Sequence, residues 1–226
     1  VCDVVPLIGL NRAIVKQGLK IISTKKNLGL KTLIDLCKID SNPNIYHLGY
    51  VLGPRINAGG RVGKSSHGAN LLLNTNPKEV FKLASELDQF NKERQLLEAD
   101  VLKKILDKTK VYVADPVLVI SGENWHEGVI GIVASRLKDK FNKPVIIISL
   151  TDNIGKASAR SITGFDIGST IIAALQKKIL IKGGGHKMAG GFSIKSENIE
   201  KFKEFIFDRF KRSNENLKKD KPLYLD

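Results

Sequence analysis

Val117-Leu118-Val119-Ile120 and Val145-Ile146-Ile147-Ile148 are the two runs of sequence that decide the fold of this chain. Continuous apolar runs of this length are typical of strands that are buried on both faces of a sheet. Between them, the stretch from Gly128 to Phe141 places apolar residues at helical spacing. A strand, a helix and a strand in this order predict a parallel pair of strands joined by a right-handed crossover.

The segments on either side of this unit add further elements. After it, the pattern predicts strands at Gly155–Ser161 and Gly191–Ile194, and helices at Asp166–Ile179 and Glu197–Phe210. Before it, Thr75-Asn76-Pro77 begins a long amphipathic helix that continues to about residue 108. Short helices are predicted between Pro6 and Cys37 and from Ser66 to Leu73, and Ile45 to Val51 is read as a helix or a strand.

These elements predict an α/β fold with a mostly helical N-terminal portion, a long connecting helix and a mixed β-sheet flanked by helices. The predicted boundaries are residues 1–75 for the helical portion, 76–110 for the connecting helix, 111–213 for the sheet domain and 214–226 for a charged tail. The chain begins Val1-Cys2 without an initiator Met, so we expect it to be a piece of a longer protein.

Composition narrows the class of protein. Of the 226 residues, 42% are hydrophobic, and no apolar run approaches the roughly 20 residues that a membrane span requires. The net charge of +14 favours nucleic acid or an acidic surface as a partner, although a lysine-rich proteome would give the same excess. The two cysteines, Cys2 and Cys37, lack zinc-site spacing and fit a reducing cytosol, so we expect a cytoplasmic protein.

The segment from Lys182 to Gly191 is the richest in glycine and is interpreted as a loop. Gly184, Gly185 and His186 lie at its centre, between two lysines. A glycine backbone can approach a phosphate closely because no Cβ shields its N–H groups. His186 could donate a hydrogen bond to a phosphate or stack on a base. A simple turn is the structural alternative.

The segment from Gly53 to Lys64 is interpreted as a second glycine-rich loop, and it carries Arg55, Asn57 and Arg61. The planar guanidinium of arginine suits bidentate binding of phosphate. The alternative is a tight turn whose arginines cap neighbouring helices.

Trp125 and His126 precede the helix of the central unit. An exposed Trp could stack on a base of a single strand, and the helix start could hold a phosphate. The alternative is a Trp folded over the sheet edge with His126 close to the helix cap.

Ser158 and Arg160 share one face of their predicted strand, because side chains alternate along a strand. A hydroxyl beside a guanidinium could form a pocket for a terminal phosphate. The alternative is an edge strand whose polar residues face water.

Asp3 could be a ligand of Mg²⁺ or Mn²⁺, although the local pattern fits a capping or surface Asp better. The sequence contains no Ser-His-Asp order, paired-carboxylate motif, phosphate-binding P-loop or HExxH motif. The residues themselves therefore predict binding rather than hydrolysis.

Together, Cys2–Leu7, Gly53–Ala58, Gly122–Leu137, Ser158–Ser161 and Gly184–Gly190 resemble the RecJ family of single-strand-specific 5′→3′ DNA exonucleases in the DHH phosphoesterase superfamily. The resemblance implies that residues 1–75 are the last part of a DHH domain and that 111–213 are a DHH-associated domain that binds nucleic acid. It also implies that Asp3 is a catalytic Mn²⁺ or Mg²⁺ ligand in the intact protein, and that this part alone is inactive.

The resemblance further implies that Arg55 and Asn57 contact DNA, that Ser158 and Arg160 hold its 5′ phosphate, and that the loop around His186 lines the strand path. The implied substrate is single-stranded DNA. Further implied partners are DNA-repair proteins such as a helicase or a single-strand-binding protein. The resemblance also leads us to expect a monomer. The chain departs from the family pattern at Gly59, Lys64, Gly183 and Gly190.

Three alternatives remain open at this point. The first is a phosphoesterase of the same superfamily that acts on short RNA or cyclic dinucleotide products. The second is a nucleic-acid-binding module without catalytic activity. The third, a domain of an aminoacyl-tRNA editing factor, fits the glycine-histidine segment but not the stretch around Trp125.

Overall fold

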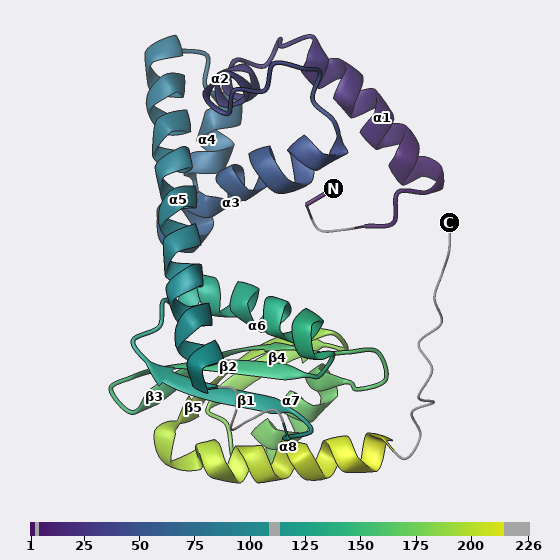
Figure 1. Cartoon of the computed structure of the whole chain (residues 1–226), viewed down its shortest axis with the longest axis vertical. Helices are drawn as coiled ribbons and strands as arrows, with labels where there is room; N and C mark the ends of the chain where they lie inside the picture. The colour runs from purple at the N-terminus through teal and green to yellow at the C-terminus, as the bar shows by residue number, and fades with distance from the viewer. Residues whose placement is uncertain (3–4, 109–113, 215–226) are drawn as a thin grey trace. The chain divides into compact units, whose positions relative to one another are not determined.

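The computed structural model describes residues 1–2, 5–108 and 114–214, and the chain divides into two compact units at Leu96 and Leu97 (Figure 1). Each unit is described by itself. Asp3 and the predicted tail from residue 215 onward lie outside the described residues. Within the described residues, no helix is long and apolar enough to cross a bilayer.

The first unit is helical, as predicted. Its elements are α1 (Gly9–Ser23), α2 (Leu28–Leu36), the π-helix η1 (His47–Leu52), α3 (Gly53–Val62), α4 (His67–Leu73) and the first part of α5 (Pro77–Lys108). The side chain of Asn27 caps α2 by accepting a hydrogen bond from the N–H of Leu30, and Asn76 does the same for Lys78 at the start of α5. The core of this unit contains Leu33, Ile34, Leu52, Leu71, Val80, Ala84 and Leu87.

The segment from Gly53 to Lys64 is a helix for most of its length, so its interpretation as a loop is wrong. Pro54 lies in the first turn of α3, where a missing N–H is harmless. Gly59 is buried, and a Cβ there would lie 2.7 Å from the carbonyl oxygen of Lys64. Glycine at this position therefore permits close packing. Because glycine also occurs in turns, its presence in the sequence does not distinguish a tightly packed helix from a loop.

The second unit contains a five-stranded sheet in the order β1-β2-β3-β5-β4. Its elements are β1 (Leu118–Glu123), α6 (Glu127–Phe141), β2 (Val145–Thr151), β3 (Ile154–Arg160), α7 (Ile167–Gln176), β4 (Lys182–His186), β5 (Ala189–Lys195), η3 (Ser196–Asn198) and α8 (Ile199–Asn214). β1 and β2 are parallel, as predicted, and all the other pairs are antiparallel. The predicted mixed α/β class is confirmed.

Lys182 to Gly191 is a hairpin of β4 and the start of β5, so its interpretation as a loop is also wrong. Glycine is a poor strand former by propensity, which hides this strand in the sequence. The structure shows why glycine occurs here. A Cβ on Gly183 would lie 2.9 Å from Cγ2 of Ile171, and one on Gly168 would lie 2.9 Å from the backbone of His186. These glycines allow α7 to pack directly on the hairpin.

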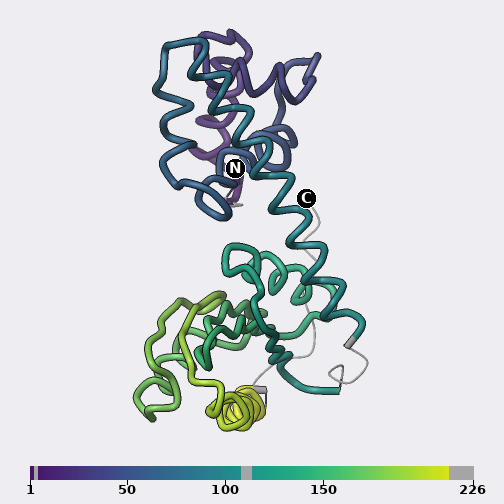
Figure 2. The backbone as a smooth tube through the Cα atoms, turned by 90° about the vertical axis from the view of Figure 1, so that its left-hand side faces the viewer, coloured from purple at the N-terminus to yellow at the C-terminus, as the bar shows by residue number. Residues whose placement is uncertain are grey.

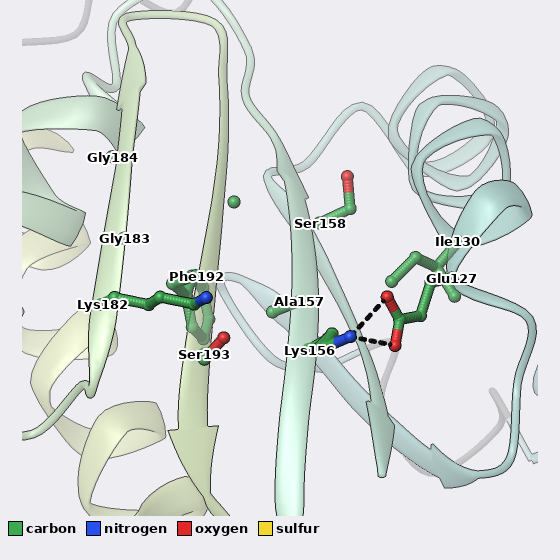
Figure 3. Close-up of a pocket in the computed structure, with 11 residues that line it drawn as sticks. Glu127, Ile130, Lys156, Ala157, Ser158, Lys182, Gly183, Gly184, Phe192 and Ser193 are labelled. Atoms are coloured by element: carbon green, nitrogen blue, oxygen red, sulfur yellow. Dashed lines mark hydrogen bonds and ion pairs between the residues drawn. The ribbon is translucent and has the colours of Figure 1, made fainter. Parts of the chain in front are cut away.

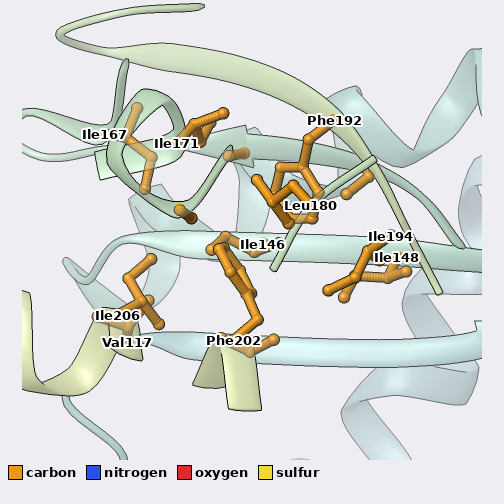
Figure 4. Packing of buried hydrophobic residues seen from close by; sticks show 14 of the residues in the cluster. Val117, Ile146, Ile148, Ile167, Ile171, Leu180, Phe192, Ile194, Phe202 and Ile206 are labelled. Carbon is orange, nitrogen blue, oxygen red and sulfur yellow. The ribbon is translucent and has the colours of Figure 1, made fainter. Parts of the chain in front are cut away.

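Each face of the sheet has its own core. One core packs against α7 and α8 and includes Ile146, Ile148, Phe192, Ile194 and Phe202 (Figure 4). The other packs against α6 and the end of α5, with Leu118, Ile120, Val133, Val145 and Ile147. Figure 2, in which α8 is seen end-on, shows α6 and α8 on opposite sides of the sheet. Because α6 packs on β2 and β3, this face is open over β5 and β4.

Candidate nucleic-acid interface

The open part of the sheet presents three rows of residues across β3, β5 and β4. Paired residues of antiparallel strands point to the same face, and alternate residues point to the opposite face. Since Ala157, Ala159 and Phe192 point into the core with α7 and α8, their neighbours point to the α6 side. The rows on the α6 side are Lys156–Ser193–Lys182, Ser158–Gly191–Gly184 and Arg160–Ala189–His186.

A shallow groove of about 620 Å³ lies over the first two rows. Figure 3 shows Glu127 and Ile130 of α6 on one side and Lys182 of β4 on the other. The residues between them are small, because Ser158, Gly184 and Gly191 occupy the middle row. The groove therefore combines a bare floor with charged margins, a combination that suits an extended polyanion.

Ser158 and Arg160 are held together at one end of this floor. The guanidinium Nη1 of Arg160 donates hydrogen bonds to Oγ of Ser158 at 3.1 Å and to the carbonyl oxygen of Ala159 at 2.8 Å. Its Nε donates to Oγ of Ser135 in α6 at 3.1 Å. A Cβ on Gly131 would lie 3.0 Å from both Arg160 and Ser158, so this glycine lets α6 approach them. The predicted pair is thus brought together and oriented in advance.

His186 ends the third row, at the turn between β4 and β5. Its Nδ1 accepts a hydrogen bond from the N–H of Met188 at 3.3 Å, and the side chain is exposed. The turn is tied to the segment that follows β3. The N–H of Ser161 donates to the carbonyl oxygen of Met188 at 2.8 Å, and that of Ile167 donates to Lys187 at 3.2 Å. These bonds hold His186 and Arg160 at opposite ends of one row.

Gly184 differs from the glycines that face α7. A Cβ built on Gly184 would meet no atom within 4 Å, and its φ is not positive. Neither packing nor backbone conformation requires glycine there. On the open face, the missing side chain leaves the backbone accessible to another molecule. Gly185, by contrast, packs against the backbone of Ala189 and Gly190.

Trp125 and His126 occupy structural positions. Trp125 is 8% exposed and packs over Gly122 in the core beneath α6, which agrees with the alternative of a Trp folded against the sheet and not with an open stacking platform. Its carbonyl oxygen accepts a hydrogen bond from Oγ of Ser149 at 2.6 Å. His126 caps α6, because its Nδ1 accepts a hydrogen bond from the N–H of Gly128 at 3.1 Å. In the sequence, Trp125 lies outside any apolar run, but this position does not show whether the side chain is buried or exposed.

Arg55, Asn57 and Arg61 lie on α3 of the first unit. Nε of Arg55 lies 2.8 Å from Oδ1 of Asp88 in α5, and its Nη1 donates to the carbonyl oxygen of Val51. Partial burial alone would raise the pKa of Asp88, but hydrogen bonds from Lys92 and Arg55 outweigh it and hold that pKa below its ordinary value. Arg55 thus joins two helices. Asn57 and Arg61 are exposed and share one helix face at a spacing of four residues.

Several residues of the groove were not identified as site residues from the sequence. Lys156 and Lys182 flank the floor, Ser193 lies between them, and Glu127 stands beside Lys156. Strand alternation from Ser158 predicts the direction of Lys156. The other residues could not be found, because the sequence does not show which strand pairs with which.

The described residues contain no group of three His, Cys, Asp or Glu side chains that could hold a metal ion. The described residues therefore do not by themselves form a Mn²⁺ or Mg²⁺ centre. The predicted ligand Asp3 is not among the described residues.

Comparison with known proteins relates the chain to two named groups. Residues 108–212 match the DHHA1 domain. Over 203 residues the chain is 36% identical to the single-stranded-DNA-specific exonuclease RecJ of Bacillus subtilis, and this match covers 88% of the chain. It is also 33% identical to RecJ of Thermus thermophilus over 206 residues, 90% of the chain. The chain is similar to a part of RecJ over about nine tenths of its own length.

The structural comparison agrees with the RecJ assignment. The crystal structure of Thermus thermophilus RecJ in complex with Mg²⁺ matches with a TM-score of 0.83 and 31% identity, over 94% of this chain and 33% of that one. The same protein in complex with Mn²⁺ matches equally well. The chain spans 26% of the Bacillus subtilis RecJ and 29% of the Thermus thermophilus RecJ. It therefore corresponds to about a third or less of each.

Proposed function

We propose that this chain forms the strand-binding part of a single-strand-specific 5′→3′ DNA exonuclease and that the groove over β3, β5 and β4 receives the DNA. The observation that carries the proposal is the bare floor at Gly184 and Gly191 between cationic side chains. Similarity to proteins named single-stranded-DNA-specific exonuclease RecJ supports both the substrate and the reaction.

In this proposal, Arg160 and Ser158 bind the 5′-terminal phosphate. The guanidinium is already oriented by Ser135 and Ser158, so little side-chain freedom is lost when a phosphate binds. Backbone groups of the glycine floor come close to the sugar-phosphate chain. His186 can donate its Nε2–H to the same phosphate or its neighbour, because Nδ1 accepts the hydrogen bond from Met188.

The role of these residues is to bind and orient the strand. Hydrolysis in the whole protein is proposed to use Mn²⁺ or Mg²⁺, the ions present in the two Thermus thermophilus RecJ structures. Such ions activate water and stabilise the leaving oxygen. Asp3 as one ligand rests on the family resemblance. Arg55, Asn57 and Arg61 are proposed to contact DNA from the first unit.

The test is equilibrium binding of fluorescent oligonucleotides, measured by anisotropy. We expect tighter binding to a 5′-phosphorylated single strand than to the 5′-hydroxyl strand or to blunt duplex, with steep weakening as salt rises. Arg160→Lys should weaken binding of the phosphorylated strand about tenfold and leave the 5′-hydroxyl strand nearly unchanged, because lysine cannot reproduce the planar fork.

Arg212→Lys is the matched control, because Arg212 lies at the exposed end of α8 and pairs with Asp208. It should change neither affinity. Equal binding of single strand and duplex, or no effect of Arg160→Lys, would contradict the proposal. Stronger competition by a dinucleotide than by a long strand would instead favour a phosphoesterase for short products.

A further inference from the structure

The end of the groove far from Arg160 holds an unexplained polar pair. Lys182 and Ser193 face each other across β4 and β5. Ser193 is 7% exposed and lines the groove, and within the described residues its hydroxyl has no hydrogen-bond partner. Figure 3 shows both side chains at the same end of the groove. This hydroxyl oxygen is not one of the buried atoms without a partner, so it is open to the groove and can donate a hydrogen bond to a ligand there.

The charges at this end are unequally balanced. Nζ of Lys156 lies 2.7 Å from Oε1 and 2.9 Å from Oε2 of Glu127, so its charge is compensated. Lys182 is exposed and has no ion-pair partner in the part of the chain that the structure describes. The uncompensated cation therefore lies beside the unpaired hydroxyl. An ammonium and a hydroxyl that share one small site suit an anionic oxygen as ligand.

We propose that Lys182 and Ser193 form a second phosphate subsite, which binds an internal phosphate of a strand whose 5′ phosphate lies at Ser158 and Arg160. This inference rests on the proposed function. The rows of Lys182 and Arg160 are separated by four residues, or about 13 Å along the strands, and β4 and β3 are two strand spacings apart, so the two backbone positions lie about 16 Å apart. A stacked strand rises about 3.4 Å per nucleotide, so about five nucleotides span this distance, and an extended strand needs fewer.

Two consequences follow from a second subsite at this distance. The groove distinguishes a strand from a dinucleotide, because a dinucleotide cannot occupy both ends. It also gives the strand a direction, with the 5′ end at Arg160 and the following nucleotides toward Lys182. The unlike chemistry of the two ends, an oriented guanidinium and an ammonium with a hydroxyl, opposes binding in the reverse direction.

The experiment measures the affinity of 5′-phosphorylated oligothymidylates of two to eight nucleotides. Lys182→Gln should weaken binding of the octamer about three- to tenfold and leave the dinucleotide unchanged, and Ser193→Ala should weaken the octamer about threefold. Lys201→Gln removes the same charge from α8, which covers the opposite face of the sheet, and should have no effect at any length. Melting temperatures confirm that each variant is folded.

A second measurement locates the subsite on the DNA. Single phosphates of the octamer are replaced in turn by neutral methylphosphonates. The wild-type protein should show weakened binding at one internal position, and Lys182→Gln should lose the sensitivity at that position. Equal effects of Lys182→Gln on dinucleotide and octamer, or no effect at all, would overturn the second subsite. If Arg160→Lys is also without effect, the proposed function fails as well.

Discussion

At the scale of the residue, Glu127 is the group in the groove whose charge opposes the proposed ligand. Its carboxylate compensates Lys156 and lines the groove, beside the proposed path of the phosphates. We predict that Glu127→Gln strengthens binding of single-stranded DNA about threefold or more, because it removes repulsion and frees a cation. In a plot of the logarithm of the binding constant against the logarithm of the salt concentration, the slope should become steeper by about 0.7 for one added phosphate contact. Unchanged or weaker binding would show that Lys156 requires Glu127 for its position.

Gly183 and Gly184 are neighbours with opposite environments. A Cβ on Gly183 would lie 2.7 Å from Cβ of Phe192, whereas one on Gly184 would meet nothing. We predict that Gly184→Ala raises the free energy of unfolding by about 0.4–1 kcal/mol and weakens DNA binding. Gly183→Ala should lower stability by about 1–3 kcal/mol through overpacking. Thermal unfolding measures the stability of both variants, and fluorescence anisotropy measures their binding of DNA. A loss of stability in Gly184→Ala would contradict this prediction.

Single residues also show how far sequence reasoning reaches. Ser158 and Arg160 were correctly placed on one strand face, because strand alternation is a local property. The environment of Trp125 was not predictable in the same way. Its burial depends on the close passage of Gly122 and on α6, and these contacts form only when the sheet and helix pack.

At the scale of the element, the apolar runs and helix caps located α5, α6, β1 and β2 close to their observed bounds. The glycine-rich segments were wrongly interpreted as loops, because glycine occurs both where a chain turns and where two elements pack closely. At Gly59 of α3 and Gly183 of β4 its role is packing. Strand order is likewise absent from the sequence, so the groove that β3, β5 and β4 form could not be derived beforehand.

The ion pair between Arg55 and Asp88 joins α3 to α5, and it provides a prediction of pH dependence. The folded pKa of Asp88 is below its ordinary value of 3.8, so the stabilisation is present above that pH and is lost as the pH falls through the folded pKa. Asp88→Asn should lower the free energy of unfolding at pH 7 by about 1–2 kcal/mol. The difference from wild type should shrink as the pH falls below 3.8.

Denaturant titrations between pH 3 and 7 measure this difference. Asp100→Asn is the control, because Asp100 pairs with Lys104 at positions where both side chains are more than half exposed. It should change stability by less than about 0.5 kcal/mol at every pH. A constant difference for Asp88→Asn across the range would show that packing, and not charge, accounts for its effect.

At the scale of the whole molecule, the two units have separate hydrophobic cores. We therefore predict two calorimetric transitions. Leu33→Ala should lower the stability of the first unit by about 2–5 kcal/mol, and Phe202→Ala that of the second by about 3–5 kcal/mol. Each variant should shift one transition and leave the other in place. A single transition that moves with both variants would show that the units unfold together.

The hydrogen bonds that fasten Lys187 and Met188 to the segment after β3 have a consequence for thermodynamics. A receptor that is rigid before its ligand arrives gives up little disorder of its own on association. Most of the ordering entropy then falls on the polynucleotide, and any loss of stacking between its bases adds an enthalpic cost. Where unstacking is needed it absorbs heat, so a pyrimidine homopolymer, which stacks weakly in solution, should associate more exothermically than adenine-rich DNA of equal length.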